Sequence, residues 1–230
     1  MLNAEHVWRS GAEVLLRIED HDRERCRPEF EAGILEDLDW LGYRADGPLV
    51  RQSERGAVYQ AAVDELVPRG LVYGCSCSRK DLEVRPCSCR ERGLPLHDGV
   101  GWRLRMDPGV ESFVDQRLGP QQQDPSAEGD VLIRDRLGNW TYQFVAGVDD
   151  FRQGIDLVIR GEDLLASTGR QIRIARLLGR ERQATFFHHP LLMKSPTQKL
   201  SKSDGDTGIR ELRARGWTPE QVQQAARSSG

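Results

Sequence analysis

The sequence predicts an α/β protein, and two observations lead to that prediction. Short runs of apolar, β-compatible residues alternate along the chain with amphipathic stretches of helical period. The run AEVLLRIE at 12–19 has a continuous apolar centre, which is typical of a strand buried on both faces. The stretch RPEFEAGILEDLDWLG follows it, with Pro28 at a helix start and Gly42 at the helix end. Alternating strands and helices favour a mostly parallel sheet covered by helices.

The remaining elements show the same two periodicities. The first helix directs one apolar stripe toward the core, formed by Phe30, Ile34, Leu38 and Leu41. A second helix begins with Ser53 as its cap and ends near Pro68. The last helix has a capping box made by Thr218 and Gln221. Further strands are expected at LVY, GWRLRM, ESFVDQ, GDVLIRD, DLVIR and ATFFHHPLLM, further helices at WTYQFVAGVDD and STGRQIRIARLLG, and a polar loop at GPQQQDPSAEG.

Composition and charge restrict the class of protein. The chain has 230 residues, 38% hydrophobic and 30% charged, which is enough for one substantial core, in one domain with an insertion or in two small ones. No apolar run is long enough to span a bilayer and the N-terminus lacks the order of a secretory signal, so a cytoplasmic location is expected. The net charge of -3 hides an asymmetry, because residues 170–215 carry +7 and residues 1–169 carry -10. The basic segment is either a surface for a polyanion or a set of solvated helix faces.

Four of the five cysteines fall within fifteen residues, as Cys75-x-Cys77 and Cys87-x-Cys89. Thiolates at this spacing can converge on one tetrahedral ion, and zinc tolerates a shell made only of sulfur. Four protein ligands leave no position for an activated water, so the predicted zinc is structural. Two disulfides are the alternative, which a chain without a secretory signal disfavours.

Charged residues follow two of the predicted strands. Glu19, Asp20 and Asp22 come directly after the first strand, and Arg160 opens the sequence RGED after DLVIR. Open α/β sheets collect their ligands at the carboxyl ends of strands, so two such edges that face one another would form a polar cleft. The alternative is a solvated loop whose acids pair with nearby arginines.

Other groups that often carry chemistry are less informative. His188 and His189 have no third ligand or nucleophile at useful spacing, and we interpret them as ordinary strand-end histidines. No G-x-G-x-x-G or Walker-type glycine loop occurs, so a nucleotide would have to be bound by other groups.

The stretch KLSKS at 199–203 resembles the KMSKS signature of class I aminoacyl-tRNA synthetases, in which loop lysines contact the phosphates of ATP as the amino acid is activated. Two ammonium groups on a loop can stabilise the negative charge that develops during attack on the α-phosphate. The sequences LLRIEDHD, RPEFEAGILEDLDWLG, TYQFVAGVDD, VIRGEDLLASTGRQI and HHPLL occur in the order expected of the glutamyl branch. The chain is identified as a member of that branch, and the resemblance covers nearly its whole length.

The resemblance implies a Rossmann-like catalytic domain interrupted by a small insertion. Residues 1–73 and 101–195 would form the two parts of this domain, residues 74–100 the zinc-binding insertion, and residues 196–230 the KMSKS-like loop and C-terminal helices. Only 27 residues follow Ser203, so no anticodon-binding domain is expected. This shortened form resembles the glutamyl-queuosine tRNA(Asp) synthetases, ligases that activate glutamate with ATP and attach it to the queuosine base in the anticodon of tRNA(Asp). RGEDLLAST and the cysteines after LVYG carry this part of the resemblance.

Site residues follow from the matched motifs. Glu19 resembles the position that receives the α-ammonium group of glutamate, and Tyr142 and Arg160 match the other glutamate-binding positions. The planar fork of Arg160 suits the side-chain carboxylate. Lys202 is the catalytic, ATP-binding lysine of the signature, with Lys199, Ser201 and Lys202 together forming the ATP-binding set. The implied partners are glutamate, ATP with Mg²⁺ and tRNA(Asp) carrying queuosine, for a monomer without membrane contact.

The chain departs from the branch in two places. Its pattern often supplies the third zinc ligand as a tyrosine, where Arg85 stands here; arginine cannot ligate zinc, so the role falls to Cys87. The HIGH motif, which binds ATP, is absent together with the first strand. Either Met1 is internal to a longer protein, or the chain is a form that binds without activating, so its activity is an open question. The alternatives to the queuosine ligase are a catalytic fragment of a glutamyl-tRNA synthetase and a non-catalytic tRNA-binding protein.

Overall fold

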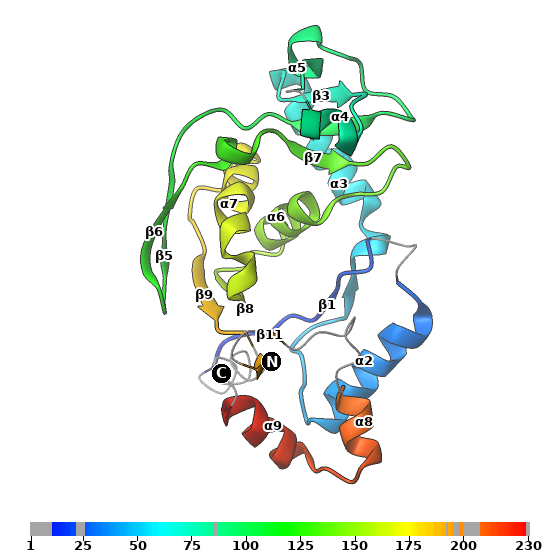
Figure 1. Ribbon diagram of the computed structural model, residues 1–230, viewed down its shortest axis with the longest axis vertical. Coiled ribbons are helices and arrows are strands. Elements are labelled where there is room, and N and C mark those ends of the chain that lie inside the picture. Colours follow the sequence, from blue (N-terminus) through cyan, green and yellow to red (C-terminus); the bar gives the residue numbers. More distant parts are fainter. Residues whose placement is uncertain are drawn as a thin grey trace.

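Strands and helices alternate along the chain as predicted, in a computed structural model of the protein that describes residues 11–21, 26–84, 87–191, 193–195, 198–199 and 208–228 (Figure 1). The strands are β1 (Arg17–Ile18), β2 (Val50–Arg51), β3 (Val72–Cys75), β4 (Gly101–Leu104), β5 (Glu111–Asp115), β6 (Gly119–Gln123), β7 (Val131–Arg134), β8 (Leu157–Gly161), β9 (Thr185–His189), β10 (Met193–Ser195) and β11 (Gln198–Lys199). The helices are α2 (Pro28–Trp40), α3 (Gly56–Leu66), α4 (Arg79–Val84), α5 (Cys89–Arg92), α6 (Tyr142–Arg152), α7 (Thr168–Leu177), α8 (Ile209–Ala214) and α9 (Pro219–Ser228).

Among the residues described the largest sheet is mostly parallel, as expected, whereas the strands of the smaller sheets are largely antiparallel. The largest has the order β6-β5-β9-β8, in which β5 and β8 each run parallel to β9, and β6 runs antiparallel to β5. Strands β3, β4 and β7 form a separate antiparallel sheet, and β1 pairs with β2 in parallel. A short connection such as the one between β5 and β6 permits only antiparallel pairing, because a parallel return needs a long crossover.

The polar loop predicted at 119–129 is in part a strand, which corrects the prediction. Gly119–Gln123 forms β6 and pairs residue by residue with β5. The side chain of Asp115 accepts hydrogen bonds from the backbone N–H groups of Arg117 and Leu118 and closes the turn, and Gly119 adopts a positive φ of 75°. The glutamines of β6 tolerate this place because one side of the strand remains accessible to water.

The first predicted strand is shorter and less buried than expected. Only Arg17–Ile18 is regular, and its residues are partly accessible. The preceding backbone is held by side-chain and main-chain bonds to the neighbouring segment, since Val14 N–H donates to the Asp46 carboxylate at 2.8 Å and Val50 N–H donates to the Leu16 carbonyl at 3.1 Å. In the described residues β1 has one strand neighbour, β2, which explains why its faces are not both covered.

Helix α2 has the predicted bounds, and Gly42 follows it with a φ of 73°. Its apolar stripe is only partly buried, because Leu38 is 9% exposed whereas Phe30 is 58% and Ile34 is 41% exposed. The side of α2 near Leu38 carries Asp37, which accepts a hydrogen bond from Arg213 of α8 at 3.2 Å. The predicted helix is confirmed, but only part of its apolar stripe is buried among the described residues.

The predicted caps have different outcomes. Ser53 does not cap α3, which starts at Gly56; Ser53 lies in a short 3-10 turn and donates its backbone N–H and its hydroxyl to the Asp20 carboxylate, at 2.9 and 2.6 Å. The capping box of α9 is confirmed. Thr218 N–H donates to Gln221 Oε1 at 2.8 Å, and Gln221 N–H donates to the Thr218 hydroxyl at 3.3 Å.

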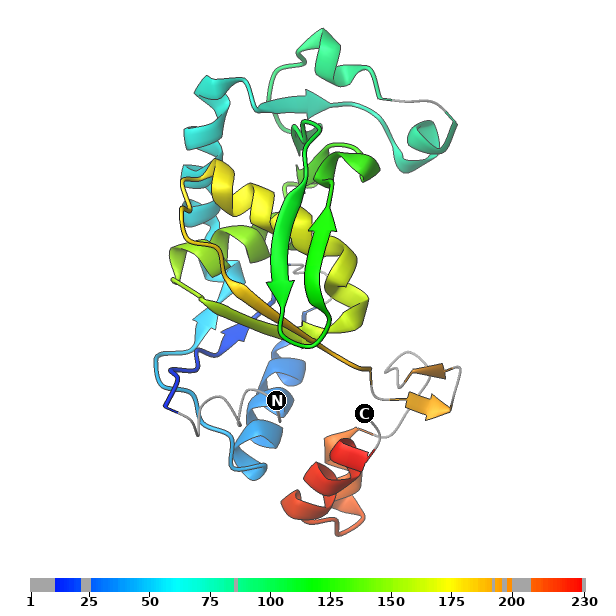
Figure 2. The same cartoon turned by 90° about the vertical axis from the view of Figure 1, so that its left-hand side faces the viewer.

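The main core lies between the antiparallel sheet β3-β4-β7 and helices α3, α6 and α7. Helices α6 and α7 approach closely at Gly147, where a Cβ atom would lie 3.2 Å from Ile174. The cysteine segment with α4 and α5 lies at one end of the molecule and α8 and α9 lie at the other (Figure 1), and Figure 2 shows the same arrangement from the side of the β5–β6 hairpin. None of the described helices is both long enough and apolar enough to cross a membrane.

Candidate functional site

The end of β1 is fixed against helix α6 by a network of charges. Arg17 of β1 donates to Asp150 of α6 at 3.0 Å and to Gln153, the residue that follows α6, at 2.8 Å. The guanidinium of Arg17 also lies 3.5 Å from the carboxylate of Glu19, whose side chain is 44% exposed. Glu19 is therefore held beside α6 while its carboxylate stays accessible.

Tyr142 opens helix α6 and interacts with both other predicted glutamate-binding residues. Burial raises the pKa of the Tyr142 phenol, and the Glu19 carboxylate raises it further, whereas the Arg160 guanidinium lowers it. The ring of His21 lies 6.4 Å from the Tyr142 ring, and His21 Nδ1 is 2.7 Å from Gln52 Oε1. The polar ends of β1, β8 and α6 thus meet in one region.

Arg160, on β8, is partly buried and tightly held. Its Nε donates to His188 Nε2 at 3.0 Å, one terminal nitrogen donates to the Thr168 hydroxyl at 2.7 Å, and the other donates to Gln171 Oε1. Burial lowers the pKa of Arg160, and the nearby Tyr142, Asp150 and Glu19 groups offset only part of that effect. The structure therefore brings Glu19, Tyr142 and Arg160 within electrostatic range of one another.

The predicted ATP-binding residues are placed less completely. Lys199 belongs to β11, whose partner is β10. Ser201 and Lys202 lie outside the described residues, as does Arg85. Their predicted roles stay predictions.

The four predicted metal ligands lie together at the end of β3 and the start of α5. Their sulfur atoms all lie within 4.8 Å of one another, and Cys75 and Cys77 are 3.6 and 3.8 Å from Cys87, while Cys77 is 3.6 Å from Cys89. A disulfide would bring two sulfurs to about 2.05 Å. Sulfurs at the corners of a tetrahedron with zinc–sulfur bonds of about 2.3 Å are about 3.8 Å apart. The set fits a tetrahedral metal ion and not two disulfides.

The charges of the cluster also fit a cation. Burial and the neighbouring thiols raise the pKa of Cys77 to about 12. Burial alone would also raise the pKa of Cys89, but hydrogen bonds from Ser76 and Arg92 lower it to about 6. Several thiols packed together resist ionisation unless a positive charge lies between them, which a divalent ion supplies. Together the four cysteines could hold one metal ion.

In the part of the basic segment 170–215 that the structure describes, four arginines interact with acids of the first part of the chain. Arg173 and Arg176 both donate to the buried carboxylate of Glu111, and Arg213 donates to Glu36 at 2.6 Å. Arg170 lies 3.4 Å from Glu128. These four arginines neutralise acids of residues 1–169, and the two interpretations of the segment's charge both stay predictions.

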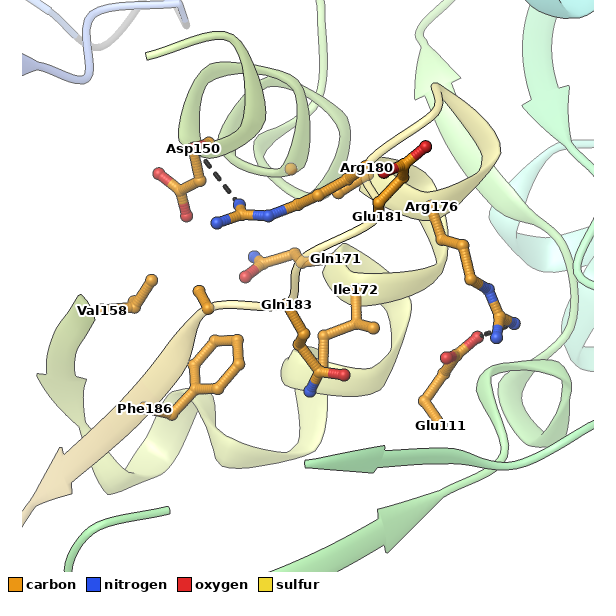
Figure 3. A pocket seen from close by; sticks show the side chains of 13 residues that line it. Glu111, Asp150, Val158, Gln171, Ile172, Arg176, Arg180, Glu181, Gln183 and Phe186 are labelled. Atoms are coloured by element: carbon orange, nitrogen blue, oxygen red, sulfur yellow. Dashed lines mark hydrogen bonds and ion pairs between the residues drawn. The ribbon is translucent and has the colours of Figure 1, made fainter. Parts of the chain in front are cut away.

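A small cavity of about 90 Å³ opens between α6, α7, β8 and β9 (Figure 3). Gln171 and Phe186 line it, and Arg180 crosses it to donate to the Asp150 carbonyl at 3.3 Å. Glu19, Tyr142 and Arg160 are not among its lining residues. The cavity is therefore not formed by the three predicted glutamate-binding residues.

Sequence reasoning missed the groups that hold Arg160. His188 is 0% exposed and Asp115 is 1% exposed; His188 lies near the end of β9 as interpreted, but its bonds to Asp115 and Arg160 were not foreseen. Both lie in phase with buried aromatic neighbours, Phe186 on β9 and Phe113 on β5. A polar residue that alternates with buried apolar ones points into the core, and this signal could have identified them.

The chain matches the family model described as tRNA synthetases class I (E and Q), catalytic domain, over residues 1–94 and 101–230. It is 44% identical to the Glutamyl-Q tRNA(Asp) synthetase of Bordetella bronchiseptica, covering 86% of this chain and 65% of that protein. It is 35% identical to the protein of the same name from Rhodobacter capsulatus, covering 93% and 87%.

A solved structure has the same fold. The glutamate tRNA ligase from Elizabethkingia meningosepticum, in complex with its amino acid, superimposes with a TM-score of 0.75 at 23% identity, over 94% of this chain and 54% of that one. The predicted Rossmann-like α/β class is thereby confirmed. With the family match and the extent of these similarities, the chain belongs to the catalytic-domain family of class I tRNA synthetases for Glu and Gln.

Proposed function

We propose that the protein activates glutamate with ATP and transfers it to the queuosine base in the anticodon of tRNA(Asp). The names of its relatives, Glutamyl-Q tRNA(Asp) synthetase, support this activity. The observation that supports the proposal is the electrostatic interaction of Tyr142 with both Glu19 and Arg160, which would give the site an acid, a phenol and a guanidinium. An amino acid with a second carboxylate is complementary to that set of charges.

Glutamate would bind with its two ends distinguished. Glu19 would receive the α-ammonium group, and Arg160 would receive the side-chain carboxylate through the second N–H of each terminal nitrogen. The α-carboxylate is then the one left to react. Its oxygen attacks the α-phosphorus of ATP and pyrophosphate leaves; a nucleophile of the queuosine base then attacks the activated carbonyl, and AMP leaves.

Lys199, Ser201 and Lys202 would bind the ATP phosphates, with Mg²⁺ accompanying the nucleotide. Lys202 would stabilise charge on the phosphates during the first step. We further propose that Cys75, Cys77, Cys87 and Cys89 bind a structural zinc ion in the segment 74–100. This segment would interrupt a catalytic domain formed by residues 1–73 and 101–195, and residues 196–230 would add the KMSKS-like loop and C-terminal helices. The protein would work as a monomer in the cytoplasm. Zinc would supply no step of the reaction, because all four of its positions are taken by sulfur.

The experiment is a transfer assay with labelled glutamate and ATP. Label is expected on tRNA(Asp) that carries queuosine, and none on tRNA(Asp) made without it. Cleavage of the labelled tRNA in the anticodon loop should place the label on the anticodon fragment.

Two other outcomes identify the rivals. Label at the 3′ end of tRNA(Glu) would contradict the proposal and favour a glutamyl-tRNA synthetase, the activity named for the solved structure that shares the fold. Binding of tRNA without glutamate-dependent exchange of pyrophosphate into ATP would favour a non-catalytic tRNA-binding protein.

A further inference from the structure

Three polar side chains form a line across three adjacent strands of the main sheet. Arg160 on β8 is paired in register with His188 on β9, and Asp115 on β5 lies on the other side of β9. His188 is fully buried and Asp115 is nearly so. Buried polar groups in the middle of a sheet are costly unless they are bonded, so their bonds should define one arrangement.

The hydrogen bonds fix the tautomer of His188. Arg160 Nε can only donate, so His188 Nε2, at 3.0 Å, must accept and carries no proton. The remaining proton is on Nδ1, which lies 2.6 Å from Asp115 Oδ2 and donates to it. The same carboxylate oxygen accepts the backbone N–H of His188 at 2.9 Å.

The pKa shifts of His188 and Asp115 agree with a neutral imidazole that donates to Asp115 and accepts from Arg160. Burial lowers the pKa of His188, and the nearby Arg160 lowers it further, while Asp115 opposes the change. Burial would raise the pKa of Asp115, but the bonds from His188 and from the turn at Leu118 lower it. A carboxylate, a neutral imidazole and a guanidinium therefore follow one another from β5 to β8.

Arg160 is clamped on its other sides as well. The buried hydroxyl of Thr168 and the amide of Gln171 each accept from one terminal nitrogen, and the centre of the guanidinium lies 5.7 Å from the Phe186 ring. Phe186 also stacks on His188 at 6.0 Å. Of these partners, only His188 is itself oriented by a charged group, which gives it a directional influence on Arg160.

We propose that His188, oriented by Asp115, is a positioning residue that holds the guanidinium of Arg160 in place for the side-chain carboxylate of the bound amino acid. It thereby sets the preference for glutamate over glutamine. This inference rests on the proposed function of Arg160 and adds to it a specificity device outside direct contact with substrate.

The test is equilibrium binding of glutamate and glutamine to the full chain by calorimetry. His188→Leu removes the acceptor, and glutamate should bind about 10-fold more weakly because Arg160 is no longer held, with little change for glutamine. His188→Gln offers an amide oxygen where Nε2 was and should recover part of the loss. The matched control is His189→Gln, since His189 is the next residue of β9 and its Nδ1 lies 2.8 Å from the Pro190 carbonyl.

Equal weakening for both amino acids in His188→Leu, or no recovery in His188→Gln, would overturn the inference. A second measurement does not depend on a variant that folds. In the ¹⁵N-labelled wild-type chain the His188 imidazole should show a protonated Nδ1 and an unprotonated Nε2, and the opposite tautomer would contradict the arrangement. A wild-type chain that binds neither amino acid would instead contradict the proposed function, and the tautomer would still decide whether His188 holds Arg160.

Discussion

The hydroxyl of Tyr59 in α3 donates to the carboxylate of Asp149 in α6 at 2.8 Å, and both residues are 0% exposed. The same carboxylate accepts from Gln52 at 3.0 Å and from Arg55 at 2.7 Å. A buried carboxylate with three donors joins the two helices next to the residue, Asp150, that holds β1. Two adjacent residues of α6, Asp149 and Asp150, therefore bond the core residue Tyr59 and the strand β1 that precedes Glu19.

Tyr59→Phe should lower the free energy of unfolding by about 1–2 kcal/mol, because it leaves one lone-pair direction of the buried Asp149 unsatisfied while it preserves the ring. Urea denaturation followed by tryptophan fluorescence measures the change. The control is Tyr43→Phe, at a partly exposed tyrosine, for which a change within about 0.5 kcal/mol is expected. Equal losses in the two variants would show that Asp149 does not depend on the Tyr59 hydroxyl.

Features that depend on near neighbours in the chain could be predicted from the sequence. Helix α2 begins at Pro28 and is followed by Gly42 in a left-handed conformation, as the sequence indicates. The box of Thr218 and Gln221 is also present as predicted. In each case the interactions that set the helix end join residues within one or two turns of backbone, so distant contacts do not change it.

Features that depend on distant partners were not predictable in the same way. Strand β6 consists of glycine, proline and glutamines, and it is a strand only because β5 lies beside it. The mixed sheet order and the network of Asp115, His188 and Arg160 combine residues far apart in the sequence. The resemblance to a family pointed to Glu19, Tyr142 and Arg160, and local alternation could mark Asp115 and His188 as buried, but not that they hold Arg160.

The cysteine cluster predicts about one zinc ion per chain, measured by elemental analysis of protein purified without added metal. Cys77→Ser should lower the zinc content and the thermal stability together, because the metal is bound only when the cluster is assembled. Cys26→Ser is the matched control, since Cys26 is far from the cluster in sequence and is exposed. Full zinc content in Cys77→Ser, or four fewer titratable thiols in the metal-free denatured protein, as two disulfides would give, would contradict a four-cysteine site.

The proposed glutamate site predicts different effects for its two charged residues. Glu19→Gln removes the partner of the α-ammonium group and should weaken glutamate and glutamine alike, by about 10-fold or more. Arg160→Lys keeps the charge but loses the planar fork, so it should weaken glutamate more than glutamine. Calorimetric titration with both amino acids gives the ratio of the dissociation constant of glutamine to that of glutamate. If that ratio fell in Glu19→Gln and stayed unchanged in Arg160→Lys, the roles assigned to Glu19 and Arg160 would have to be exchanged.

The unfolding free energy of the protein should decrease as the pH falls below about 6.5, and His188 should be one cause. Burial and the neighbouring Arg160 and Arg117 lower the pKa of His188, although Asp115 opposes them. In the unfolded chain the His188 imidazole takes up a proton near its ordinary pKa, whereas in the folded chain it is protonated only at a lower pH. The unfolded state then binds more protons, so stability is complete above the unfolded pKa and decreases toward the folded one, by at most about 1.4 kcal/mol per pH unit.

Asp115, which binds His188, does not contribute to the loss of stability just below pH 6.5. Its pKa in the folded protein is below the ordinary value, so its stabilisation is present above about pH 4 and is lost only at more acidic pH. Urea denaturation of the wild type and of His188→Gln, at several pH values between 7.5 and 5.5, isolates the histidine because all other groups are common to both. The wild type should lose more stability than the variant across that range. Parallel curves would mean that His188 titrates alike in the folded and unfolded chains, which a neutral imidazole held between Asp115 and Arg160 does not allow.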